Sequence, residues 1–222
     1  MGLTGVIIPA LNAEDTLPEL LDRLALFVDC RDVIVVDDGS TDQTADAASK
    51  AGARVLRHAA NKGKGAALRT GFDYSCSSNS YESVITMDAD LQHPPEEIPK
   101  FLEARRSLHA NLIIGHRTRV GSQMPLHRVL SNTITSGLVS ARTGRAIRDS
   151  QSGYRLLGRE VLEAIRVESD GYEAETELLI KAALKGFIID FVPVATVYRN
   201  ERSHMTHWTT TKRFLQVLLR DY

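Results

Sequence analysis

The strongest constraint on the fold of this chain is a repeated alternation between short apolar runs and longer segments with helical spacing. The apolar runs are rich in β-branched residues and are the length of strands. Five of them occur between residues 5 and 115, at residues 5–9, 33–36, 54–57, 84–87 and 112–115. Strands that alternate with helices form βαβ units. We therefore predict an α/β fold, a mostly parallel, doubly wound sheet with flanking helices.

Each predicted strand ends in a polar cluster. In doubly wound sheets, ligands bind outside the carboxyl ends of the strands, so these clusters should share one edge. Surface loops are commonly polar, and chance could supply some of them. Five on one edge nevertheless favour a binding site over chance. The clusters are Asn12 with Glu14, Asp37–Asp38, Asn61–Lys64, Asp88–Gln92 and His116–Arg117.

The fourth cluster, after the apolar run 84–87, carries the clearest chemistry. Asp88 and Asp90 are alternate residues, so an extended chain directs both carboxylates the same way. With Gln92 close behind, they suit a hard divalent cation, Mg²⁺ or Mn²⁺, held by one or two side chains plus phosphate oxygens. Taken alone, the pattern is also that of a solvated acidic turn.

The remaining segments complete one predicted domain over residues 1–222, divided into a nucleotide-binding half, 1–117, and an acceptor-side half, 118–222. Thr16 and Glu19 form a capping-box pattern ahead of a helix with an apolar stripe that includes Phe27. Pro94 and Pro95 are expected to open another helix. Further helices are predicted at 126–141, at 175–185 and through 214–218, and a strand at 187–194. The apolar stripe of 126–141 favours core packing over a lid or acceptor surface. That stripe consists of Leu126, Val129, Leu130, Ile134, Leu138 and Val139.

Composition limits the cellular setting and the partners. A formal net charge of −1 argues against a general nucleic-acid binder. Cys30 and Cys76 have no metal-ligand spacing and are expected to be free thiols in a reducing compartment. The chain enters a strand almost at once, without a signal peptide, and no apolar run approaches the roughly 20 residues of a membrane span. We expect a cytoplasmic protein, with peripheral contact at the inner face of the membrane as an option.

An acidic metal site, a second-strand aspartate and basic loops together suggest a nucleotide diphosphate ligand. Asp38 would accept hydrogen bonds from a base or ribose. A metal would bridge the diphosphate oxygens, and Arg117 and Arg199 would add fixed positive charge. The loop 61–65, with Lys64, precedes a helix and is either an anion site or a simple helix start with glycines that fit the turn.

Three motifs resemble family 2 glycosyltransferases, in the order and spacing of the GT-A fold, a Rossmann-like nucleotide-sugar-binding fold. They are residues 5–12, 35–42 and 87–94. Residues 149–155 with 187–194 are most similar to the branch that contains dolichyl-phosphate mannose and glucose synthases. The resemblance implies an inverting hexosyltransferase that uses a GDP-mannose or UDP-glucose type of donor.

The resemblance also implies roles for particular residues. Asp88, Ala89 and Asp90 would hold the diphosphate and metal, with Gln92 as a further metal ligand. An aromatic residue is usual where Leu11 stands, and a glutamate where Ala13 stands, which Glu14 may replace. The family lysine of the C-terminal loop is replaced by His204, and Gln151 belongs to the acceptor-side motif. Residues implied to line the nucleotide or reach the donor phosphates are Pro9, Val36, Asp38, Arg117 and Arg199.

The acceptor decides the mechanism. A sugar hydroxyl needs a general base, for which Asp149 is the first candidate, with Glu175 and Glu177 behind it. A polyprenyl phosphate is already ionised and needs none, so Asp149 would then orient a substrate. We expect hexose transfer to a polyprenyl or dolichyl phosphate. A glycan, protein or small-molecule acceptor and a catalytically silent nucleotide-sugar-binding protein remain alternatives. A nucleotidyltransferase is disfavoured because residues 10–14 lack glycine.

Overall fold

The computed structural model describes residues 3–78, 80–117, 126–195 and 207–222, and the side chains of 126–128 and 207–210 are not described. The strands form a seven-stranded sheet in the order β3-β2-β1-β4-β6-β5-β7. Among the described strands, only β6 runs antiparallel to its neighbours, so the sheet is mostly parallel, as predicted. The strands are β1 Leu3–Ala10, β2 Val33–Asp37, β3 Arg54–Arg57, β4 Tyr81–Thr86, β5 Leu112–Arg117, β6 Arg155–Gly158 and β7 Ile189–Val194.

The antiparallel strand β6 was not predicted. It is four residues long, begins with a charged residue and has no β-branched side chain, so it lacks the local pattern of a strand. It forms because β4 and β5 supply hydrogen-bonding partners on both sides, with Arg155 opposite Thr86 and Ile114. Its direction brings the preceding loop, residues 149–154, to the edge of the sheet where β4 and β5 end.

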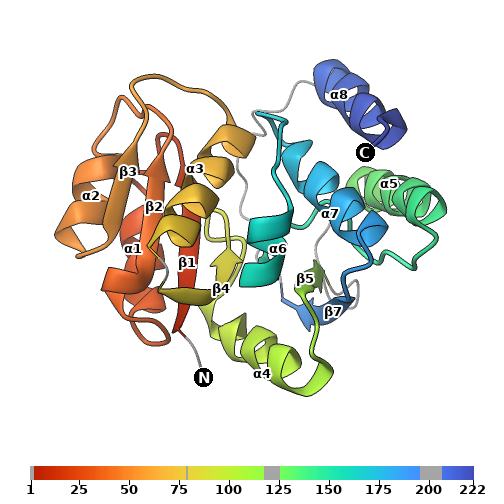
Figure 1. Cartoon of the computed structure of the whole chain (residues 1–222). Helices are drawn as coiled ribbons and strands as arrows, with labels where there is room; N and C mark the ends of the chain where they lie inside the picture. The colour runs from red at the N-terminus through yellow and green to blue at the C-terminus, as the bar shows by residue number, and fades with distance from the viewer. Residues whose placement is uncertain (1–2, 79, 118–125, 196–206) are drawn as a thin grey trace.

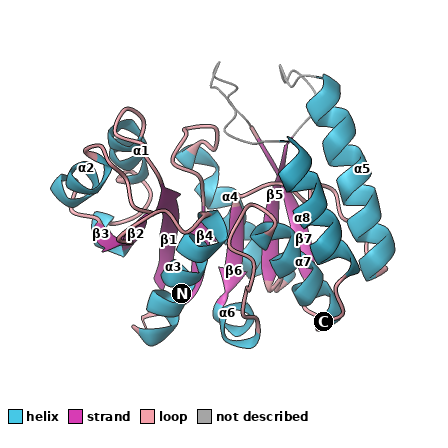
Figure 2. Cartoon of the chain, turned by 90° about the horizontal axis from the view of Figure 1, so that it is seen from above, coloured by secondary structure: helices cyan, strands magenta, loops and turns pink. Residues whose placement is uncertain are grey.

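Helices cover both faces of the sheet (Figure 2). One apolar core joins the sheet to α1, α2 and α4, and a second joins it to α3, α6 and α7. The central strands β1 and β2 are buried on both sides, which explains their nearly continuous apolar sequence. The helices are α1 Leu17–Leu24, α2 Thr44–Lys50, α3 Lys64–Ser77, α4 Ile98–Leu108, α5 Leu126–Thr143, α6 Arg159–Ala164, α7 Ala174–Leu184 and α8 His207–Leu219.

Helices α5 and α8 form an outer layer against α7 (Figure 1). The expected core stripe of α5 is wrong for its middle, because Leu130, Ile134 and Leu138 are 62%, 53% and 40% exposed. Val139, at the end of the predicted stripe, is buried as expected, and Asn132 and Ser136, which were not part of the stripe, are buried with it. Helix α5 packs on α7 and α8, and these contacts leave Leu130, Ile134 and Leu138 uncovered.

Two helix starts and one helix end also differ from expectation. Thr16 precedes α1, but its side chain makes no capping hydrogen bond, so the expected capping box is not formed. Helix α1 ends at Leu24, and Phe27 lies in the following turn, where it is 36% exposed. Pro95 opens a short 3₁₀ turn, residues 95–97, and α4 begins only at Ile98.

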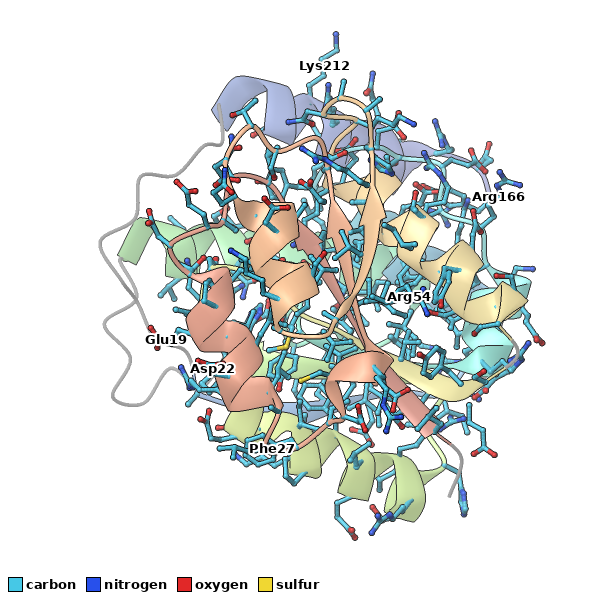
Figure 3. All side chains as sticks on the ribbon, turned by 90° about the vertical axis from the view of Figure 1, so that its left-hand side faces the viewer. Glu19, Asp22, Phe27, Arg54, Arg166 and Lys212 are labelled. Atoms are coloured by element: carbon cyan, nitrogen blue, oxygen red, sulfur yellow. The ribbon has the colours of Figure 1, made fainter. Side chains whose placement is uncertain are left out.

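The β3 end of the sheet faces the viewer in Figure 3. Arg54 and Arg57 are exposed on this edge strand, and charged side chains discourage pairing with another chain. Among the described residues, no helix is long and apolar enough to cross a membrane. Both cysteines are free thiols, as predicted.

Candidate active site

The carboxyl ends of β4 and β5 and the loop that enters β6 form the centre of the candidate site. Thr86 ends β4 and donates a hydrogen bond from Oγ1 to the carbonyl of Gly153, at 2.8 Å. The backbone N–H of Gly115 in β5 donates to the carbonyl of Tyr154, at 2.9 Å. These contacts fix residues 149–154 between Asp88 on one side and Arg117 on the other. The sheet therefore brings together polar groups that are more than 60 residues apart in the chain.

Arg117 and Asp149 form a two-pronged ion pair at this edge. Nε of Arg117 donates to Oδ2 of Asp149 at 2.8 Å, and Nη2 donates to Oδ1 at 3.0 Å. The side chain of Asp149 is only 2% exposed, and the backbone N–H of Gln151 also donates to it. Burial alone would raise the pKa of Asp149, but the hydrogen bonds and charge of Arg117 lower it. Asp149 is thus a bound, ionised carboxylate.

A second ion cluster lies on the other side of the loop. Nζ of Lys64 is 2.5 Å from Oδ1 of Asp88 and 2.8 Å from Oε1 of Glu175. Burial would lower the pKa of Lys64, but the two carboxylates raise it above its ordinary value. Burial would raise the pKa of Asp88, but Lys64 lowers it. The lysine therefore carries a full charge, shared between two carboxylates.

Gly153 and Arg155 lie next to this ion cluster. A Cβ atom on Gly153 would lie 2.7 Å from Oε1 of Glu175 and 3.0 Å from Nζ of Lys64, so a larger residue would crowd the cluster. The fully buried Arg155 donates to the carbonyls of Ser150, Ser152 and Glu175. Sequence reasoning did not single out Arg155; the available signal was a charged residue at the entrance to an otherwise apolar strand.

Asp90 and Gln92 lie in the turn after Asp88. The backbone N–H of Gln92 donates to Oδ1 of Asp90 at 3.0 Å, and Leu91 between them has a positive φ of 62°. The donor set offered by Asp88, Asp90 and Gln92 consists of hard oxygens, which fits Mg²⁺ or Mn²⁺ completed by phosphate and water. No group of three or more histidine, cysteine or acidic residues that could hold a metal occurs among the described residues. A metal here would depend on oxygens from a ligand.

His93 is a buried neighbour of this turn that the sequence did not single out. Burial lowers its pKa to about 4, so the ring is neutral near pH 7. The ring stacks on Tyr154, whose hydroxyl donates to the carbonyl of Pro94 at 3.1 Å. These contacts join the turn after β4 to the loop before β6, so the two segments that form the site pack directly on each other.

The buried carboxylate of Asp38 binds the backbone of the loop that precedes α3. Its Oδ1 accepts hydrogen bonds from the backbone N–H of Lys62, and its Oδ2 from that of Gly63. His58 lies 2.6 Å from Oδ1 through Nδ1 and reaches Thr70 through Nε2. Asp38 is buried and both of its carboxylate oxygens accept hydrogen bonds within the protein, and its contact with a base or ribose stays a prediction.

The start of α3 does not offer the anion site that was one of two options for the loop 61–65. The N–H groups of Gly65 and Ala66 both donate to the carbonyl of Asp170. Gly63 has a positive φ of 99°, and a Cβ there would lie 2.3 Å from the same carbonyl oxygen. The helix-start interpretation is therefore the one the structure supports, and the glycines permit close packing against residues 169–171.

Of the other residues predicted to bind the nucleotide, some lie at the surface and some in the core. Leu11 is exposed at the end of β1, Pro9 is partly buried, and Ala89 is buried. The side chain of Val36 is fully buried in the core because β2 is covered on both faces, so only its backbone could line a ligand, and its role stays a prediction. Glu14 accepts a hydrogen bond from the N–H of Gln43 before α2.

A hollow of about 410 Å³ opens at the ends of β2 and β3. Its outer wall includes Arg57, which is paired with Asp37 at 3.1 Å. The hollow is the right order of size for a planar ring system. It is lined by Gly39, Ser40, Thr41, Arg57, His58 and Ala59.

The four remaining predicted residues have different outcomes. Gln151 is exposed beside the Arg117–Asp149 pair. Glu177 is wrong as a reserve base, because it is fully buried and accepts hydrogen bonds from the N–H groups of Glu168 and Ser169. Arg199 and His204 lie outside the described residues, and their roles stay predictions.

Comparison with known proteins identifies the family. The model described as glycosyl transferase family 2 matches residues 5–166, which is more than half of the chain. The chain belongs to glycosyltransferase family 2. An undecaprenyl-phosphate mannosyltransferase of Micrococcus luteus is 35% identical over 204 residues, covering 87% of this chain and 83% of that protein. An uncharacterized protein of Methanocaldococcus jannaschii is 34% identical, covering 95% and 94%.

Two further similarities concern substrate and fold. A polyprenol monophosphomannose synthase of Mycolicibacterium smegmatis is 33% identical, covering 88% of this chain and 78% of that protein. Glucosyl-3-phosphoglycerate synthase from Mycobacterium tuberculosis, in complex with Mn²⁺, UDP-glucose and phosphoglyceric acid, superposes with a TM-score of 0.76 at 25% identity. The superposition covers 98% of this chain and 79% of that chain. The family 2 glycosyltransferase therefore has the expected GT-A-like α/β fold.

Proposed function

We propose that this glycosyltransferase moves a hexose from a nucleotide diphosphate sugar to a polyprenyl phosphate, with inversion at the anomeric carbon. The observation that carries the choice of acceptor is the two-pronged bond between Arg117 and Asp149. A general base must be able to take a proton near neutral pH. Asp149 is buried, bonded through both oxygens and has a lowered pKa, so it is a poor base.

The two reserve candidates support the same conclusion. Glu175 is bonded to Lys64, and Glu177 is fully buried and accepts two backbone hydrogen bonds. A phosphate monoester is ionised at neutral pH and can attack without a base. The polyprenyl-phosphate activities of the Micrococcus and Mycolicibacterium relatives agree with an acceptor of this class.

For the donor, we propose that residues 1–117 bind the nucleotide sugar and residues 118–222 form the acceptor side. Asp88, Asp90 and Gln92 would hold Mg²⁺ or Mn²⁺, which would offset charge on the departing diphosphate. Arg117, whose orientation is fixed by Asp149, would lie beside that group as a hydrogen-bond donor. The hollow at the ends of β2 and β3 suits the base. The identity of the base, GDP or UDP type, is open to direct measurement.

The decisive experiment compares two acceptors that differ in one group. The purified chain is incubated with radiolabelled GDP-mannose or UDP-glucose, Mn²⁺, and either polyprenyl phosphate or the matching polyprenol. We expect label to enter the organic phase only with the phosphate. Transfer to polyprenol at a similar rate would contradict the proposed absence of a base. Label transferred only to a glycan, protein or small-molecule hydroxyl would support the alternative acceptor class. Donor binding without any transfer would support a catalytically silent nucleotide-sugar-binding protein.

The outer face of α5 supports an acceptor that resides in a lipid layer. Leu130, Ile134 and Leu138 form an exposed apolar stripe at helical spacing. Residues 118–148 contain arginines but no aspartate or glutamate, which favours contact with anionic lipid headgroups.

This peripheral contact can be measured without donor or acceptor. We expect the chain to float with vesicles of phosphatidylcholine and phosphatidylglycerol, and the triple serine variant of Leu130, Ile134 and Leu138 to bind at least fivefold less. Serine replacements of the exposed Leu26 and Leu108, which lie on the α1 and α4 side, provide the matched control. Equal loss in the control, or concentration-dependent dimers lost in the triple variant, would contradict a lipid-facing role for α5.

A further inference from the structure

Lys64 lies between the carboxylates of Asp88 and Glu175, and Asp88 is one of the residues that would hold the metal. Its side chain is 13% exposed, and its ammonium bonds Asp88 on the β4 side and Glu175 on α7. The ring of Tyr172 lies 5.7 Å from the same ammonium. Lys64 is thus enclosed by groups from separate parts of the chain.

The backbone holds Lys64 in this position. It is the first residue of α3, and the next two N–H groups are bonded to the carbonyl of Asp170. Glu175 is likewise in the first turn of α7. Gly153 leaves the space that the ammonium and both carboxylates fill. The lysine is therefore built into the packing between α3, α7 and the loop before β6.

The formal charges at this position are nearly balanced. The carboxylates of Asp88, Asp90 and Glu175 are offset by Lys64 and by the buried Arg155, whose guanidinium donates to the carbonyl of Glu175. Arg117 and Asp149 cancel one another. The set carries a formal charge of −1, which is a weak attraction for a hydrated divalent ion. A nucleotide diphosphate adds negative charge and oxygen ligands.

We propose that Lys64 is the resident counter-ion of Asp88 and Glu175, and that it makes divalent-metal binding depend on the nucleotide diphosphate. Lys64 is a positioning residue in this role: it holds Asp88 without itself needing to contact the donor. The inference rests on the metal site of the proposed function and adds a reason for the order of binding. The metal is held weakly by the empty protein and tightly once the nucleotide is bound.

The test measures Mn²⁺ binding to the full chain by the electron paramagnetic resonance signal of free Mn²⁺. Without nucleotide, Lys64→Met removes the counter-ion and should bind Mn²⁺ at least tenfold more tightly than the wild type. Lys62→Met, which removes the same charge from an exposed side chain two residues away, should leave the affinity within twofold. Equal affinities of Lys64→Met and the wild type would overturn the proposal.

Two further measurements keep the proposal testable if Lys64→Met does not fold. The double variant Lys64→Met/Glu175→Gln removes one charge of each sign and should return the Mn²⁺ affinity toward the wild-type value. In the wild type, saturating GDP or UDP should tighten Mn²⁺ binding at least tenfold. Tight binding to the wild type without nucleotide would overturn the proposal. Failure of the proposed function is seen separately, as no transfer of label to polyprenyl phosphate.

Discussion

Removing one partner of the Arg117–Asp149 pair should cost a large part of the folding stability. The two side chains are 18% and 2% exposed, and the bonds between them are 2.8 and 3.0 Å long. Asp149→Asn keeps the shape of the side chain but leaves the guanidinium without its counter-ion. Breaking one partner of a buried pair costs about 3–5 kcal/mol. We expect a loss of about 3 kcal/mol in the free energy of unfolding, or a Tm lower by about 6–12 °C for a chain of this size.

The assay is urea denaturation at pH 7 of the wild type, Asp149→Asn, Arg117→Met and the double variant. Because the double variant leaves no unpaired charge, its loss should be smaller than the sum of the single losses by about 2 kcal/mol. The pKa of Asp149 is lowered in the folded state, so the stability that it contributes is present above its unfolded value near 3.9 and is lost as the pH falls through the folded value. Wild type and Asp149→Asn should therefore converge in stability below about pH 4.

Additive single losses, or a loss below about 1 kcal/mol for Asp149→Asn, would refute this reasoning. Either result would mean that the two charges do not depend on one another. The carboxylate of Asp149 would then again be available as a candidate base.

Three further predictions concern catalysis. Asp90→Ala should abolish metal-dependent turnover, and unchanged activity would remove Asp90 from the metal site. Gly153→Ala should lower turnover at least tenfold, because its Cβ would lie within 3.1 Å of Lys64, Asp88 and Glu175. Circular dichroism would confirm that the variant folds. Turnover at the wild-type rate would contradict the argument that the added Cβ crowds these side chains. Asp149→Asn should reduce turnover without changing the shape of the pH–rate profile, whereas loss of a limb near neutral pH would assign a base role to Asp149.

Much of the sheet could be predicted from the sequence because most of its strands are recognisable from their own apolar, β-branched residues. Continuous β-branched runs such as 33–36 can be satisfied only when both faces are covered, as they are in β2. Once the strands are parallel, their carboxyl ends must meet at one edge. The position of Asp88 beside the end of β4 follows from this rule, as does that of Arg117 at the end of β5.

Local pattern could not predict where charged side chains find partners across the edge. A phosphate contact was one of two options for the loop that contains Lys64. In the structure Lys64 is paired with Asp88 and with Glu175, which is 111 positions further along the chain. Asp149 was offered as a base, and Arg117 binds it. A carboxylate in a sequence has no fixed partner, because packing decides which cation is near enough to hold it.

The sequence by itself determined the parallel strands, the shared edge and the acidic turn after β4, since these depend on periodicity and on the direction of the chain. Only the tertiary structure decided that β6 inserts antiparallel between β4 and β5 and that Leu130, Ile134 and Leu138 of α5 stay exposed. Both features depend on what neighbouring elements leave unpaired or uncovered. A short segment such as Arg155–Gly158 becomes a strand because two open strand edges lie beside it, and that condition is absent from its own residues.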